Sequence, residues 1–215
     1  MGQRHQVFIH VENRNITSKE DKLIFGTKKT VTLAYHNQWL YGRSALFECA
    51  KVLAFANMKD DIYHALDAYN TKELAENIKM VLRVNQQYHG GSKGVGFHYY
   101  SFLNTEYPSM GDCIDREDNN DGVTIIDTIN KKYCFMAFCG LECDENARDT
   151  IKDYVPLSAE DYVLAYYPDK KANWHTPPTD LSEIINEAID GLSSYQVLTM
   201  DELRVMFPLQ KEFQK

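Results

Sequence analysis

Apolar and polar residues alternate along several short stretches of the chain, and this two-residue period predicts strands. Val7, Ile9 and Val11 face one way in the first of these stretches. Residues 31–35 show the same period, so a second strand is expected to end near His36. Further strands are predicted at residues 23–26 (a short edge strand), 96–103, 123–129, 132–138 and 195–198.

Elsewhere the apolar residues recur every three or four positions, which is typical of helices that cover a core. The best-defined pattern covers residues 44–57, with Ser44 placed as its N-cap. Thr199 and Glu202 have the spacing of a capping box, which predicts a last short helix. Residues 12–22 are expected to form a polar loop. Other helices are predicted at 59–69, 71–82, 158–167 and 180–191.

The order of these elements predicts an α+β fold, with one or more mainly antiparallel sheets covered by helices. The strands at 123–129 and 132–138 are expected to form a hairpin that turns at Asn130 and Lys131. No internal repeat is present, so residues 1–215 are predicted to form a single domain. Residues 145–215 are expected to be its helical C-terminal extension, packed on the rest.

In element order the chain resembles the αββα sandwich of the N-terminal-nucleophile (Ntn) hydrolases. Those enzymes use a Thr, Ser or Cys at the amino terminus, where the α-amine acts as base. This chain begins Met1-Gly2, so it would need internal cleavage to use that mechanism. The resemblance therefore implies a shape more than an activity.

Composition narrows the class of protein. The 215 residues carry a formal net charge of −8, which argues against a nucleic-acid partner, because such proteins need a basic face. Neither a membrane span nor a secretory signal is expected, and a cytoplasmic location is predicted. The five cysteines are interpreted as structural thiols, since the spacing of Cys134, Cys139 and Cys143 does not fit a zinc site.

The most distinctive polar segment joins the second strand to the helix at 44–57. An imidazole, amides, an indole and a guanidinium follow one another between His36 and Arg43, and junctions of this kind often bind ligands. His36, Gln38, Trp39 and Arg43 are therefore candidate binding residues. The alternative is that Trp39 and its neighbour Tyr41 anchor the core while the polar groups only support the turn.

Metal or cofactor binding is not expected. In the acidic loop at 112–122, Glu117, Asn119 and Asp121 follow the one, three, five pattern of a calcium loop. Thr128 stands where such a loop needs a bidentate glutamate, so a solvated loop leading into the hairpin is the preferred interpretation. The seven histidines show no ligand-pair spacing, and no nucleophile-elbow motif is present.

Three motifs together resemble those of an uncharacterised protein family that occurs in phages, large DNA viruses and some fungi. No activity is known for that family. The motifs are Arg4-His5-Gln6, the turn 36–42 (HNQWLYG) and residues 118–122 (DNNDG). Where the family turn often has a second histidine and a cysteine, this chain has Asn37 and Leu40, so no thiol chemistry carries over. The resemblance implies a viral or phage origin, hence a host cytoplasm, and a shared polar site that comprises Arg4, His5, Gln6, His36, Gln38 and Trp39.

Two functional hypotheses follow. In the first, the chain is a phage or viral accessory protein that binds a protein partner or a small ligand at the His36–Arg43 turn. In the second, it is a hydrolase or transferase with His5 or His36 as general base. Both place the two polar segments side by side, which requires antiparallel pairing of the first two strands. Oligomeric state cannot be read from the sequence.

Overall fold

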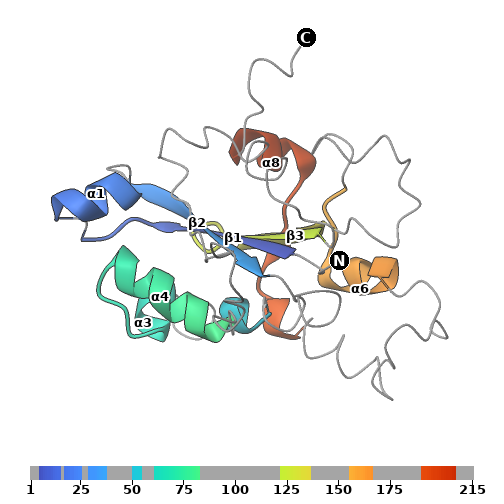
Figure 1. Ribbon diagram of the computed structural model, residues 1–215. Helices are drawn as coiled ribbons and strands as arrows, with labels where there is room; N and C mark the ends of the chain where they lie inside the picture. The colour runs from blue at the N-terminus through green and yellow to red at the C-terminus, as the bar shows by residue number, and fades with distance from the viewer. Residues whose placement is uncertain are drawn as a thin grey trace, which may run out of the picture.

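A computed structural model describes residues 5–15, 17–25, 29–37, 50–54, 61–82, 122–136, 155–166 and 190–206. Within these residues the fold is α+β: one sheet has helices on both of its faces (Figure 1). The five strands are β1 (His5–Glu12), β2 (Thr30–Asn37), β3 (Gly122–Asp127), β4 (Lys132–Met136) and β5 (Gln196–Val197).

The sheet is mixed, with the strand order β2-β1-β3-β4-β5. β1 pairs antiparallel with β2, and β3 pairs antiparallel with β4, as the predicted hairpin requires. The pairs β1–β3 and β4–β5 are parallel, so the expectation of a mainly antiparallel sheet was too simple. Parallel pairing needs a long connection, and long segments separate the members of both pairs. The described residues form a single sheet, and the two-sheet Ntn-like sandwich stays a prediction.

The helices agree with the apolar periodicity at most of the predicted places. The helix predicted at 71–82 is confirmed and begins at Thr71; Asn70 is its N-cap and accepts a hydrogen bond from Glu73 N at 2.9 Å. Residues 50–54 are helical inside the segment predicted at 44–57. No described helix has the length and hydropathy needed to cross a membrane. The named helices are α1 (Lys19–Phe25), α3 (Ile62–Ala65), α4 (Thr71–Val81), α6 (Ala159–Tyr166) and α8 (Met200–Met206).

α1 replaces what the sequence predicted as polar loop and a short edge strand at 23–26. Ser18 starts the helix: its Oγ accepts a hydrogen bond from Asp21 N at 2.9 Å, and its carbonyl accepts one from Lys22 N. Glu20 and Asp21 lie in the first turn, where negative charge favours the helix. The signal was therefore a serine N-cap followed by acidic residues, and three consecutive apolar residues concealed it.

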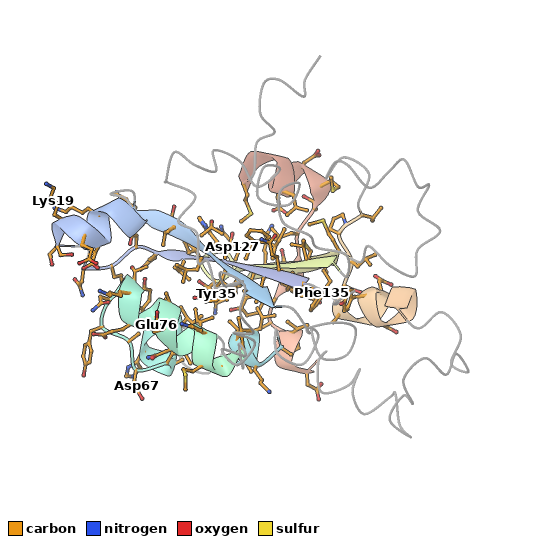
Figure 2. All side chains as sticks on the ribbon, in the orientation of Figure 1. Lys19, Tyr35, Asp67, Glu76, Asp127 and Phe135 are labelled. Atoms are coloured by element: carbon orange, nitrogen blue, oxygen red, sulfur yellow. The ribbon has the colours of Figure 1, made fainter. Side chains whose placement is uncertain are left out.

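Side chains on the two faces of the sheet belong to two apolar clusters. Val7, Ile9 and Tyr35 face the side covered by α3, α4 and α6 (Figure 1), and the Tyr35 hydroxyl donates to Ala75 O of α4 at 2.9 Å (Figure 2). Phe8 and Leu203 belong to the second cluster, on the side of α8. The alternation read from the sequence is thus confirmed in β1 and β2. In β4, both faces are covered, because Tyr133, Cys134, Phe135 and Met136 are all buried.

Cys134 supports the interpretation of the cysteines as structural thiols. Its side chain is fully buried, and burial raises the pKa of the thiol far above its ordinary value. A thiol with so high a pKa is a poor nucleophile. The remaining four cysteines lie outside the described residues.

α8 is attached to the hairpin by charge as well as by apolar contact. Thr199 and Glu202 form the predicted capping box: Glu202 Oε2 accepts from Thr199 N at 2.9 Å, and Thr199 Oγ1 accepts from Glu202 N at 3.3 Å. Glu202 also accepts a hydrogen bond from Lys132 of β4. Mainly because of this Lys132 bond, the pKa of Glu202 is lowered to about 2. α8 is therefore tied to the strand that it covers.

A polar cluster joins the end of β1 to α3 and α4, on the face of the sheet opposite α8. We call Glu12, Asn13, Arg14, Asp61, Tyr63 and Thr71 the Arg14 cluster. The Arg14 guanidinium donates to Glu12 at 2.6 Å and to Asp61 at 2.8 Å, and it lies 4.3 Å from the centre of the Tyr63 ring. The Tyr63 hydroxyl donates to Glu12 O and lies 2.9 Å from Thr71 Oγ1. These contacts hold α3 and the start of α4 against the end of β1.

The Tyr63 hydroxyl is expected to contribute measurably to stability. Tyr63→Phe leaves the part-buried Glu12 carbonyl and the buried Thr71 hydroxyl short of one partner, which should lower the free energy of unfolding by about 1–2 kcal/mol. Tyr69→Phe is the matched control, because the Tyr69 side chain is 81% exposed. Urea denaturation of the two variants measures the difference. Equal stabilities would show that the cluster does not hold the helices.

Candidate functional site

All three sequence motifs reach the same end of the sheet. β1 and β2 are antiparallel, as predicted, and their register places His5 opposite Asn37 and Gln6 opposite His36. β1 and β3 are parallel, which places Gly122, the last residue of the DNNDG motif, opposite His5 on the other side. We call this the motif end of the sheet. It combines residues from motifs that are far apart in the sequence.

Gly122 has a specific backbone role at this end. Its φ of 124° lies in a region that residues with a Cβ rarely adopt. Any other residue would be strained at the position where the chain enters β3 beside His5. The glycine of the DNNDG motif is therefore explained by the path of the backbone.

His5 is an interior residue. Its Nε2 lies 2.7 Å from Thr124 Oγ1, and its ring meets the edge of the Tyr162 ring with 6.4 Å between centroids. The His5 side chain is 0% exposed. An imidazole beside a hydroxyl group is the pair that a general base and a nucleophile would form. Here, however, α6 and the sheet cover the pair. A substrate would have to displace this cover to reach it.

Gln6 lies on the other face of the sheet. Because side chains alternate along β1, Gln6 shares the Phe8 face and His5 the Val7 face. His36 is in register with Gln6 and not with His5. The predicted single polar site is therefore divided between two faces where its members are described. The two-residue period of β1 already contained this division.

The other predicted site residues lie outside the described parts of the chain. These are Arg4, Gln38, Trp39 and Arg43, together with the weak metal candidates Glu117, Asn119 and Asp121; the His36 backbone is described as part of β2. Among the described residues, no group of three or more His, Cys, Asp or Glu side chains could hold a metal ion.

Thr124 is the residue at this end that the sequence did not predict. In the sequence Thr124 is an ordinary strand residue. Only the parallel pairing of β1 with β3 brings it to His5, which is 119 positions away. No local signal could have identified it, because strand period specifies a face but not a partner.

Comparison with known proteins adds no relative. No protein-family model matches the chain, and neither curated proteins nor solved structures show significant similarity to it. The functional conclusion therefore depends on the residues and contacts described above.

The His5–Thr124 contact is testable by substitution. Thr124→Val keeps the shape of the side chain but removes the hydroxyl at the buried imidazole, so it should cost about 1–3 kcal/mol of unfolding free energy. Thr124→Ser, which keeps the hydroxyl, is the control and should be the more stable of the two. A valine variant as stable as the original chain would mean that the contact contributes nothing. Thermal or urea denaturation provides the measurement.

Proposed function

We propose that this chain is a binding protein whose site is the motif end of the sheet and the His36–Arg43 turn that follows β2. The partner is a protein or a small ligand. Its three motifs resemble those of a protein family that occurs in phages, large DNA viruses and some fungi. This resemblance supports an accessory role in a phage or virus, with the protein acting in the host cytoplasm. The net charge of −8 speaks against a nucleic-acid partner.

The observation that carries the proposal is the register of β1. It brings the RHQ motif, the start of the HNQW turn and the end of the DNNDG loop to adjacent strands. Residues of three polar motifs therefore meet on neighbouring strands, and polar residues carried by rigid strands are the usual construction of a binding site.

The state of His5 favours binding over catalysis. A general base must come within hydrogen-bond reach of the substrate, and His5 is buried against Thr124 and Tyr162. In the proposal His5 therefore supports the end of the sheet from inside. Gln6 is fully buried as well, so it has the same supporting role. The groups proposed to meet the partner belong to the turn: His36, Gln38, Trp39 and Arg43.

A hydrolase or transferase of Ntn-like shape is the second candidate. One observation favours it: His5 Nε2 and Thr124 Oγ1 are 2.7 Å apart, the separation expected between a base and a hydroxyl nucleophile. This candidate requires an opening through which the substrate reaches the pair. It predicts that activity on an ester or amide substrate disappears in Thr124→Val and survives in Thr124→Ser.

Substitution at the turn tests the proposed binding function. A photo-crosslinking amino acid at position 38 should capture a specific partner in host lysate, and His36→Ala in the same chain should abolish the capture at little cost in stability. The same crosslinker at position 80 is the control, because the Met80 side chain is 77% exposed on α4. Capture that is equal from both positions, or unchanged in His36→Ala, would refute the site.

Trp39→Ala tests the alternative role of the indole as a core anchor. If the indole is part of the core, the substitution should lower the free energy of unfolding by roughly 3–5 kcal/mol, as measured by urea denaturation.

A further inference from the structure

One row of side chains that crosses all five strands is polar on the face covered by α8. In the register of the sheet its members are Thr32, His10, Asp127, Lys132 and Gln196. The next row on the same face is apolar and buried: Ala34, Phe8, Ile125 and Cys134. The polar row therefore brings two ionisable groups, His10 and Asp127, next to each other at the border of the core.

His10 is poorly placed to carry a charge. Its side chain is half-buried, and its Nδ1 lies 2.9 Å from Thr32 Oγ1 on β2. Burial lowers the pKa of the imidazole below its ordinary value, and the negative charge of Asp127 opposes this effect only in part. His10 is therefore largely neutral near pH 7 and takes up a proton in more acidic solution.

Asp127 caps the turn between β3 and β4 from inside the protein. The residue is 2% exposed, and its carboxylate accepts hydrogen bonds from Ile129 N, Asn130 N and Asn130 Nδ2 at 3.0, 3.0 and 2.7 Å. All three donors are neutral amides. Burial, followed by the charge of Asp127, raises the pKa of Tyr195 to about 12, so this charge acts on its surroundings. The carboxylate both shapes the turn and stands beside His10.

The other charged groups around the row are paired with one another. Lys132 of β4 donates to Glu202 of α8. Glu12, the next residue of β1 on the face of His10, is exposed and lies 2.6 Å from the Arg14 guanidinium. Among the described residues, the charge that acts on His10 is therefore that of Asp127.

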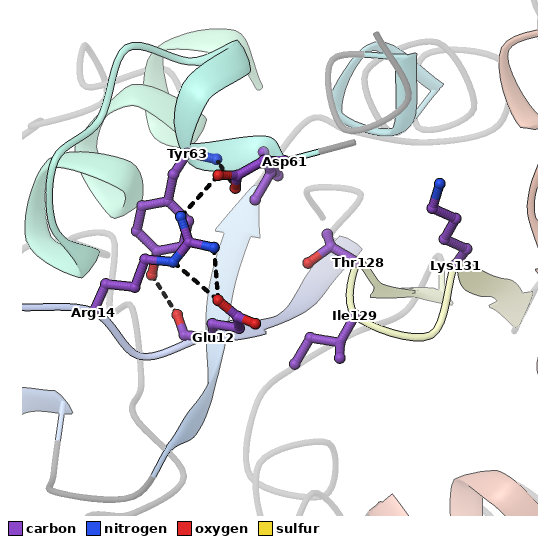
Figure 3. A pocket seen from close by; sticks show the side chains of 8 residues that line it. Glu12, Arg14, Asp61, Tyr63, Thr128, Ile129 and Lys131 are labelled. Carbon is purple, nitrogen blue, oxygen red and sulfur yellow. Dashed lines mark hydrogen bonds and ion pairs between the residues drawn. The ribbon is translucent and has the colours of Figure 1, made fainter. Parts of the chain in front are cut away.

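The backbone of His10 holds the same turn. His10 O accepts hydrogen bonds from Thr128 N at 3.1 Å and from Thr128 Oγ1 at 2.9 Å. The turn forms one wall of a hollow of about 140 Å³, and residues of the Arg14 cluster line the other wall (Figure 3). A change at His10 therefore reaches the turn and the hollow through its side chain and through its backbone.

We propose that His10 is a pH-sensitive switch: when its imidazole takes up a proton from the solvent, the turn between β3 and β4 loosens from β1. The imidazolium fits poorly in its half-buried place, so it draws either water or an oxygen of Asp127 toward itself. An Asp127 oxygen that turns toward His10 is withdrawn from the amides that it caps. Both routes weaken the hold on the turn and widen the hollow that it borders.

The turn is released as the pH falls. A histidine in an unfolded chain binds its proton at about pH 6.5, whereas folded His10 binds it only at a lower pH. Across this window the opened chain binds more protons than the closed chain. The closed state is therefore fully stable above the window and loses stability as the pH falls through it.

Hydrogen exchange of the full chain, followed by NMR at about pH 7.5 and about pH 5, tests the switch. After correction for intrinsic exchange, the Thr128, Ile129 and Asn130 amides should lose protection at the lower pH, and this loss should be smaller in His10→Gln. His64→Gln is the matched control, because His64 is exposed on α3, and it should show the loss of the original chain. A loss as large in His10→Gln, or no loss in the original chain, would overturn the proposal.

Asp127→Asn tests the contact between the two ionisable groups. The asparagine oxygen can still accept from Ile129 N and Asn130 N, so the turn keeps most of its cap while the negative charge beside His10 is removed. The pKa of His10, measured from the NMR signals of its ring protons, should therefore be lower in the variant than in the original chain. An equal or higher pKa in the variant would overturn the proposal. A His10 pKa in the original chain at or above the ordinary value would overturn it as well.

Discussion

The structure depends on β1, which pairs on both of its edges and is covered on both of its faces. Its partner β2 follows it in the chain after α1 and pairs antiparallel, whereas its partner β3 comes from a distant part of the chain and pairs parallel. Six of its eight residues are buried, His10 is half-buried and Glu12 is exposed, and Val7 and Phe8 belong to the two separate apolar clusters. A shift of one residue in β1 would exchange these clusters and send His5 to the wrong face. The register of β1 therefore fixes both the core and the motif end of the sheet.

Period and capping residues predicted most of the described elements. The alternation in β1 and β2 gave the correct faces, Thr199 and Glu202 gave the start of α8, and the hairpin turns where Asn130 and Lys131 were expected to turn it. α1 was missed because the apolar run after Lys22 resembles a short strand when it is considered without its cap. The parallel pairs could not be predicted, since strand period is local and contains no information on a distant partner.

The candidate sites were accessible to sequence reasoning to different degrees. The antiparallel pairing that brings the start of β1 beside the end of β2 was predicted from the length of the segment between the strands, and it is confirmed; the register came from the structure. The arrival of Gly122 at the same end follows from the parallel pairing of β1 with β3 and was not expected.

The most direct measurement of the central claim is the set of backbone nuclear Overhauser contacts from β1 in the isotopically labelled chain. Strands in a sheet lie about 5 Å apart, so paired residues give cross-strand contacts. The register described here predicts contacts from Val7 to Tyr35 in an antiparallel pattern and from Val7 to Thr124 in a parallel pattern. A one-residue shift in either pairing would change which residues share a face, and an antiparallel pattern between β1 and β3 would carry Gly122 to the other end of β1. Either result would contradict the account.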